Sequence, residues 1–127
     1  MTPLEPDLDR VGHMYAAARS LSNLADGVSF SDFKQDAQKR YAWLWLVVLI
    51  GEAATKVSRE TRERAPGVPW AQVTGTRNRV VHGYLDIDKV IVCAVATRHL
   101  DELIGQLAAL LQAHGVDPKQ AEEDWKP

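Results

Sequence analysis

The chain lacks the sequence features of disulfide-rich, membrane-spanning and secreted proteins. It has one cysteine, Cys93, in 127 residues, so no disulfide can form within it, which suits a reducing compartment. Its longest apolar run, 42–51, is far shorter than the roughly 20 residues that a membrane-spanning helix needs. Residues 1–7 are acidic and lack the apolar centre of a signal peptide. We therefore expect a cytoplasmic location.

Other absences limit the chemistry and the partners. There is no glycine-rich phosphate loop and no sustained alternation of apolar and polar residues, so we expect no sheet. The net charge is only -2, and we expect neither a membrane nor DNA as a partner. No two of the four histidines have the spacing of metal ligands, so we predict no metal site and no cofactor. These histidines are His13, His82, His99 and His114.

Hydrophobic periodicity predicts an all-α protein, a four- to five-helix up-and-down bundle. Apolar residues recur at spacings of three and four, with a possible break near Asp36 in the second segment. The bundle is assigned to residues 1–115, and the acidic tail 116–127 is expected to be loose apart from Trp125. The predicted helices span 7–26, about 30–64, about 69–83 and about 87–113, the last capped by Asp86 or Asp88.

The second predicted helix is apolar on every side between Tyr41 and Ile50. A helix that is apolar all round is normally buried all round. In a domain this small, the other helices can hardly cover every face, so we expect a second copy of the chain to dimerise through this helix. The alternative is that it is simply the central helix of the bundle.

Residues 77–84 read Arg-Asn-Arg-Val-Val-His-Gly-Tyr and end the third predicted helix. An imidazole can take a proton from a ribose 2′-hydroxyl or give one to a leaving oxygen, and a guanidinium can bind the phosphoryl oxygens. Asn78 lies one turn before His82, whereas Arg77, five residues before His82, lies on another face. Arg77 and His82 can therefore converge only at the helix end or across a dimer interface, and Tyr84 can fold back onto them.

A purely structural interpretation of this segment stays open. His82 can cap carbonyl groups at a helix C-terminus, Arg77 can pair with Glu52 or Glu60, and Tyr84 can be a core aromatic.

The charge of the middle of the chain is also open to two interpretations. Residues 34–82 hold nine basic and four acidic side chains, and this local field could attract a phosphate backbone through Arg59 and Arg79. The alternative is that these are ordinary charged helix surfaces.

A family resemblance adds to this interpretation. From about Leu8 to Leu111 the chain resembles the HepT-like ribonuclease toxins of the HEPN superfamily. In that family an Arg, four residues, a His, one residue and a Tyr form the diagnostic motif, and the acidic tail is not part of the pattern. The segments that carry the resemblance are Ile-Gly-Glu-Ala at 50–53, Val-Pro-Trp at 68–70, the motif within 76–84 and Asp-Ile-Asp at 86–88.

The resemblance implies a dimeric helical bundle in which two copies of the motif face one cleft. It implies a metal-independent endoribonuclease, the toxin of a type VII toxin–antitoxin pair, with Arg77 and His82 as the active pair. In the mechanism that we expect, Asn78 orients the phosphate or the imidazole. It further implies a minimal nucleotidyltransferase antitoxin that transfers AMP to Tyr84. The alternative is a non-catalytic HEPN-like module that binds a nucleotidyltransferase or its substrate.

Overall fold

The structure is a computed structural model that describes residues 5–86 and 88–127, and every regular element in these ranges is helical. The prediction of an all-α bundle is confirmed. Expectations that concern residues 1–4, Ile87 and the side chains of Asp86 and Ala96 lie outside the described residues. The α-helices are α1 (Glu5–Ala25), α2 (Phe30–Gln35), α3 (Ala37–Thr55), α4 (Arg59–Arg64), α5 (Trp70–His82), α6 (Lys89–Ala94), α7 (Leu100–Ala113) and α8 (Pro118–Asp124), with a 3-10 turn, η1 (Tyr84–Asp86), and a π turn, η2 (Val95–His99).

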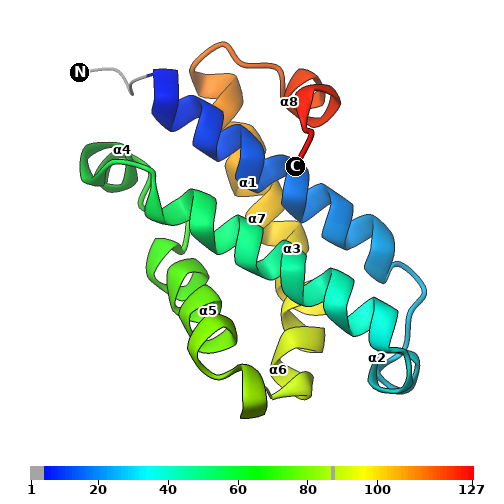
Figure 1. Ribbon diagram of the computed structural model, residues 1–127. Helices are drawn as coiled ribbons and strands as arrows, with labels where there is room; N and C mark the ends of the chain where they lie inside the picture. The colour runs from blue at the N-terminus through cyan, green and yellow to red at the C-terminus, as the bar shows by residue number, and fades with distance from the viewer. Residues whose placement is uncertain (1–4, 87) are drawn as a thin grey trace.

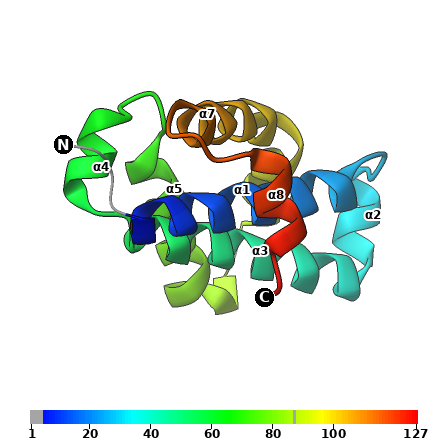
Figure 2. The ribbon, with the colours of Figure 1, turned by 90° about the horizontal axis from the view of Figure 1, so that it is seen from above.

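The long helices α1 and α3 lie side by side and run in opposite directions (Figures 1 and 2). On its other sides α1 packs against α7 and α8, and α3 packs against α5. The core forms where these helices meet, and it includes Met14 and Leu21 from α1, Trp43 from α3 and Leu107 from α7. The helix that carries the 77–84 segment is therefore placed by its contact with α3.

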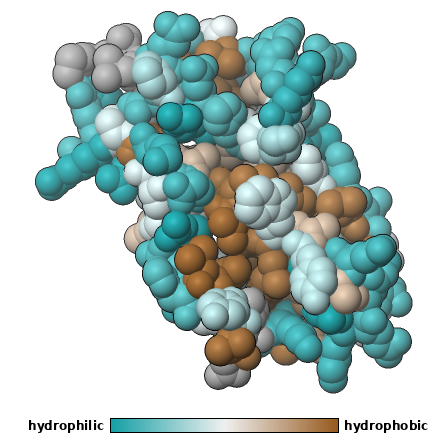
Figure 3. All heavy atoms as spheres, in the orientation of Figure 1, coloured by the Kyte–Doolittle hydropathy of each residue, from teal (hydrophilic) through white to brown (hydrophobic). Residues whose placement is uncertain are grey.

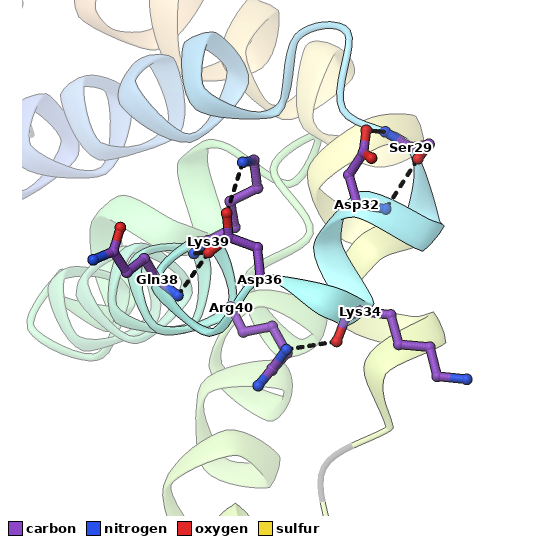
Figure 4. A network of polar contacts seen from close by, with 7 residues as sticks. All are labelled: Ser29, Asp32, Lys34, Asp36, Gln38, Lys39 and Arg40. Atoms are coloured by element: carbon purple, nitrogen blue, oxygen red, sulfur yellow. Dashed lines mark hydrogen bonds and ion pairs between the residues drawn. The ribbon is translucent and has the colours of Figure 1, made fainter.

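The predicted break near Asp36 is present, and it separates α2 from α3 (Figure 4). Ser29 and Asp32 form a capping box, in which each side chain accepts a hydrogen bond from the other residue's backbone N–H. Asp36 ends α2, and its carboxylate accepts hydrogen bonds from two backbone N–H groups in the first turn of α3. Phe33 then stacks on Trp43 with 4.5 Å between ring centroids, which fixes α2 against α3.

The prediction that this helical segment continues to residue 64 is wrong. The helix α3 ends at Thr55, and Ser58 caps the separate helix α4 by accepting a hydrogen bond from the backbone N–H of Thr61. The break is held by Asp7 of α1, which is 5% exposed. Its carboxylate accepts hydrogen bonds from the backbone N–H of Ser58 at 2.9 Å and from the hydroxyls of Ser58 and Thr61 at 2.5 Å.

Replacing Asp7 by alanine is expected to destabilise the fold by about 2 kcal/mol, because buried donors of Ser58 and Thr61 lose a charged acceptor. Burial raises the pKa of Asp7, but the hydrogen bonds from Ser58 and Thr61 outweigh it and hold the pKa below its usual value. Asp7 therefore stabilises the fold above about pH 4, and this contribution is lost as pH falls through the lowered pKa. Urea unfolding of the parent and the variant at pH 7 and pH 3 measures both effects.

The control for this prediction is Asp9→Ala, which removes an exposed carboxylate from the same helix. This variant is expected to stay within about 0.5 kcal/mol of the parent. A difference between Asp7→Ala and the parent that is as large at pH 3 as at pH 7 would contradict the role given to the charge.

The last long segment and the tail differ from the predictions. Asp88 does cap the segment, but the π turn η2 divides it into α6 and α7. The tail is not loose, because α8 begins at Pro118 and packs against α1. There Arg19 pairs with Glu122 at 2.7 Å, and the ring of Trp125 lies 5.6 Å from that of His13.

The apolar helix α3 buries only part of its surface within the chain. Trp43 and Val47 are buried, but Tyr41 is 67% exposed and Trp45 is 58% exposed. Figure 3 shows apolar residues gathered at the centre of this face, over the middle of α3 and the adjoining parts of α5 and α6. Part of this helix is therefore left uncovered by the described chain, and the dimer expected there stays a prediction. Within the described ranges, no helix is long and apolar enough to cross a membrane.

Candidate active site at the end of helix α5

Arg77 is the most firmly held of the predicted site residues. It lies on the face of α5 that packs against α3, and its side chain is 24% exposed. Its Nη2 donates a hydrogen bond to Oε2 of Glu52 at 3.0 Å, and its Nη1 donates one to Oδ1 of Asn78 at 2.8 Å. Nε is buried without an acceptor in the described part of the chain. Since a guanidinium has five N–H groups, two on the Nη atoms remain for a phosphate.

The pairing of Arg77 with Glu52 decides one of the open alternatives. Glu60 is paired with Arg64 at 3.3 Å, within α4, so it is Glu52 that holds the guanidinium. Glu52 also lies 3.7 Å from Lys56, one turn later on α3. The carboxylate therefore faces two cations, which fixes it beside Arg77 without cancelling the positive charge of the site.

Gly51 lets α5 approach α3 closely at this point. A Cβ atom placed on Gly51 would lie 2.1 Å from Cβ and 2.7 Å from Cγ of Arg77, and 3.2 Å from the carbonyl oxygen of Val73. No side chain fits there, so the stem of Arg77 lies directly on the backbone of α3. The sequence analysis missed this role, although a glycine inside an apolar helix is a signal for close packing.

His82 is the last residue of α5, and its side chain is exposed. Gly83 caps the helix end by donating its N–H to the carbonyl oxygen of Arg79 at 2.8 Å. The imidazole of His82 has no hydrogen-bond partner in the described ranges, so it is free to meet a ligand. An imidazole without another partner can take a proton from a bound ligand or give one to it.

Tyr84 follows in the turn η1, and its side chain is 69% exposed. The alternative that it is a core aromatic is therefore wrong. Its ring stands in solvent two residues beyond His82, where a second protein can reach the hydroxyl.

The remaining candidates are divided between different places. Asn78 is exposed beside Arg77 and is held by the hydrogen bond already described. Arg79 lies on another flank of α5, where it lines a separate cavity. Arg59 belongs to α4, which leads into the opposite end of α5, and it is paired with Glu63 at 2.9 Å. The structure thus brings Arg77 and Asn78 together, but it does not join either Arg79 or Arg59 to them.

Comparison with known proteins decides the family. The profile of the ribonuclease HepT-like family matches residues 14–110, which include all of α3 and α5. The chain belongs to this family. The prediction of a HepT-like ribonuclease is confirmed at that level, and the exposed His82 and the held Arg77 lie inside the matched range.

Individual relatives agree with the family. The chain is 29% identical over 100 residues, 79% of this chain and 89% of the other, to a protein of Caldanaerobacter subterraneus subsp. tengcongensis named "Putative RNase". It is 25% identical over 87 residues, 68% and 80% of the two chains, to a protein of that name from Methanocaldococcus jannaschii. It is 23% identical over 83 residues, 65% and 76% of the two chains, to the "Probable ribonuclease HepT" of Thermococcus cleftensis. No solved structure matches the chain significantly.

The family match ends at residue 110, so the tail helix α8, which packs on α1, lies outside the matched region.

Proposed function

We propose that this HepT-like protein is a metal-independent endoribonuclease toxin that works as a dimer and is neutralised by AMP transfer to Tyr84. The observation that carries the proposal is the arrangement at the end of α5. A guanidinium is held against α3, an unpartnered imidazole ends the helix, and a phenol stands exposed two residues later. These three groups can bind a phosphate, move a proton and accept a modification.

The cleavage uses the nucleophile that RNA itself carries. The imidazole of His82 takes the proton of a ribose 2′-hydroxyl, and the 2′-oxygen forms a bond to the adjacent phosphorus. The bond from phosphorus to the 5′-oxygen breaks, and an imidazolium gives that oxygen its proton. The products are a 2′,3′-cyclic phosphate and a 5′-hydroxyl. Arg77 stabilises the charge that gathers on the phosphoryl oxygens, and Asn78 orients the guanidinium.

A second copy of the chain completes the site. Arg77 and His82 are five residues apart on one helix, so they lie on different faces, and the described hydrogen bonds of Arg77 go to Glu52 and Asn78. A dimer in which two copies of α5 face one cleft supplies a second imidazole for the second proton transfer. The exposed aromatic side chains Tyr41 and Trp45 on α3 support a partner on that face.

Replacing Trp45 by glutamate is expected to convert the proposed dimer to a monomer, because each copy would bury a carboxylate in the apolar interface in place of an indole. In the same variant, cleavage of RNA should fall at least tenfold, because the dimer is lost. Light scattering after size exclusion measures the mass. The control is Leu24→Glu, an exposed apolar residue at the end of α1, which should leave the dimer intact. A dimer that persists in Trp45→Glu would contradict the assignment of this face.

Tyr84 supplies the switch. A nucleotidyltransferase joins the phenol oxygen to the α-phosphorus of ATP, the bond between the α- and β-phosphates breaks, pyrophosphate leaves, and the phenol proton goes to a base of that enzyme. The added phosphate is negative and stands two residues from His82, so it repels the RNA backbone. The exposure of the Tyr84 ring supports access by such an enzyme.

The experiment is to co-express the protein with a minimal nucleotidyltransferase encoded beside it, and to measure the intact mass and the RNA cleavage of the purified product. We expect a mass gain of one or more AMP units and a loss of cleavage. Tyr84→Phe should keep the unmodified mass and escape inhibition, whereas Tyr15→Phe, which removes the same hydroxyl from a tyrosine of α1, should still be modified. Tight binding to the nucleotidyltransferase by a protein that cleaves no RNA would favour the non-catalytic alternative.

A further inference from the structure

A cavity lies on the other flank of α5, away from the proposed cleavage site. It has a volume of about 620 Å³, within the range of small-molecule sites in proteins. Its walls come from α3, α5, α6, η2 and α7, and Arg79 rather than Arg77 or His82 belongs to its lining. Nothing in the proposed cleavage mechanism uses this space.

The walls of the cavity are mostly aliphatic, and Gln72 and Thr76 add two neutral polar side chains. They include Val47 and Ile50 from α3, Val73 from α5, and Leu100 and Leu103 from α7. The described lining holds no Phe, Tyr or Trp side chain, and its one ring is the small imidazole of His99, so the cavity offers a nucleobase no large aromatic surface on which to stack. Its surface instead matches a flexible hydrocarbon, whose burial is favourable wherever it replaces water.

The charged and polar side chains of the lining favour a negatively charged ligand. Arg79 and His99 are exposed residues of the lining, and no lining residue in the described ranges is acidic. Arg79 has no ion-pair or hydrogen-bond partner among the described side chains, unlike Arg77, Arg59 and Arg64. A cation without a counter-ion beside an apolar cavity is the arrangement that an anionic head group would satisfy.

The π turn η2 is a separate observation that indicates a functional site at the same cavity. It interrupts the long α6–α7 segment at Val95–His99, and both of its end residues line the cavity. Such turns cost helical hydrogen bonding and occur frequently at functional sites. Here His99, the last residue of the turn, lines the cavity directly before α7 begins.

From these observations we infer that the cavity binds an anionic amphiphile, a small carboxylate with a flexible aliphatic body. The hydrocarbon lies among the side chains of α3, α5 and α7, and the carboxylate lies between Arg79 and His99. This inference does not depend on RNA cleavage, so its test can fail or succeed separately from the proposed function.

The test is calorimetric titration of the full chain with decanoate. Decanoate should bind at least tenfold more tightly than decyltrimethylammonium, which has the same chain and the opposite charge, and butyrate should bind too weakly to measure. Arg79→Gln should weaken decanoate binding about tenfold. The matched control is Arg98→Gln, which removes an exposed arginine of the same turn η2 that does not line the cavity, and it should bind as the parent does.

A second variant tests the hydrocarbon part. Ala94→Leu adds a side chain at a lining position and should weaken decanoate binding, while size exclusion shows the same oligomeric state as the parent. Four results would overturn the inference: no binding of decanoate, equal binding of the cationic analogue, equal losses in Arg79→Gln and Arg98→Gln, or a nucleoside that binds in this cavity when decanoate does not. A change of oligomeric state in Ala94→Leu would overturn it too, because the cavity would then belong to a subunit interface.

Discussion

The purified His82→Ala protein is expected to lose RNA cleavage by at least a hundredfold and to keep its fold. General acid–base catalysis by a positioned side chain contributes about 10²- to 10⁴-fold to a rate, and each dimer would lose two imidazoles at once. The fold should survive because His82 is exposed at the end of α5 and holds no described hydrogen bond. Gel analysis of cleaved RNA measures the first effect, and the melting temperature measures the second.

His114 gives this experiment a matched control. It is also an exposed histidine at the C-terminal end of a helix, α7, so His114→Ala removes the same chemical group from the same kind of position. It should cleave RNA at the parent rate. Both proteins are assayed in EDTA, and the fragments should carry 2′,3′-cyclic phosphate and 5′-hydroxyl ends. Retained cleavage by pure His82→Ala protein would rule out the mechanism.

The long helices could be predicted from the sequence because their signals are local. Spacings of three and four placed α1 and α5 within a few residues of their ends, and Gly27 stops α1 with a positive φ of 73°. The break at Asp36 was also visible, since a capping carboxylate acts on the next two or three residues.

The errors arose where a distant residue decides the local structure. The helical segment breaks before Ser58 because Ser58 bonds to Asp7, fifty-one positions away. The tail folds because Glu122 reaches Arg19 and Trp125 reaches His13. No periodicity within the segment itself carries this information, because the stabilising partner lies on another helix.

The positions of the candidate residues along the chain could be predicted, but their contacts could not. The sequence predicts that Arg77, His82 and Tyr84 lie near the end of one helix, and the structure has Arg77 and His82 in α5 and Tyr84 in the turn that follows it. The sequence left Glu52 and Glu60 as equal partners for Arg77, because either could reach a long side chain. The choice follows from the packing of α5 on α3, and that packing depends on Gly51.

The Gly51→Ala variant should therefore be less stable than the parent and much less active. A methyl group in a helix interior normally stabilises by up to about 1 kcal/mol relative to glycine. Here the added Cβ would meet Cβ of Arg77 at 2.1 Å, and the obstacle is the stem of that side chain and the backbone of Val73, which cannot swing aside. Overpacking of this kind costs about 1–3 kcal/mol, so we expect net destabilisation.

The effect on cleavage should exceed the effect on stability. To make room, α5 must move away from α3, and it carries Arg77 and His82 with it. A displacement of about 1 Å can cost a factor of 10² in rate, because the guanidinium no longer meets the phosphoryl oxygens. Cleavage is measured well below the melting temperature of the variant, so that loss of folded protein does not contribute.

Gly105→Ala is the matched control for this change. Gly105 is an exposed glycine inside α7, and a Cβ added there meets nothing within 4 Å. The same substitution should therefore raise the melting temperature slightly and leave cleavage unchanged. If Gly51→Ala were as stable and as active as Gly105→Ala, the close approach of α5 to α3 would not be what positions Arg77, and Glu52 alone would have to hold the guanidinium in place.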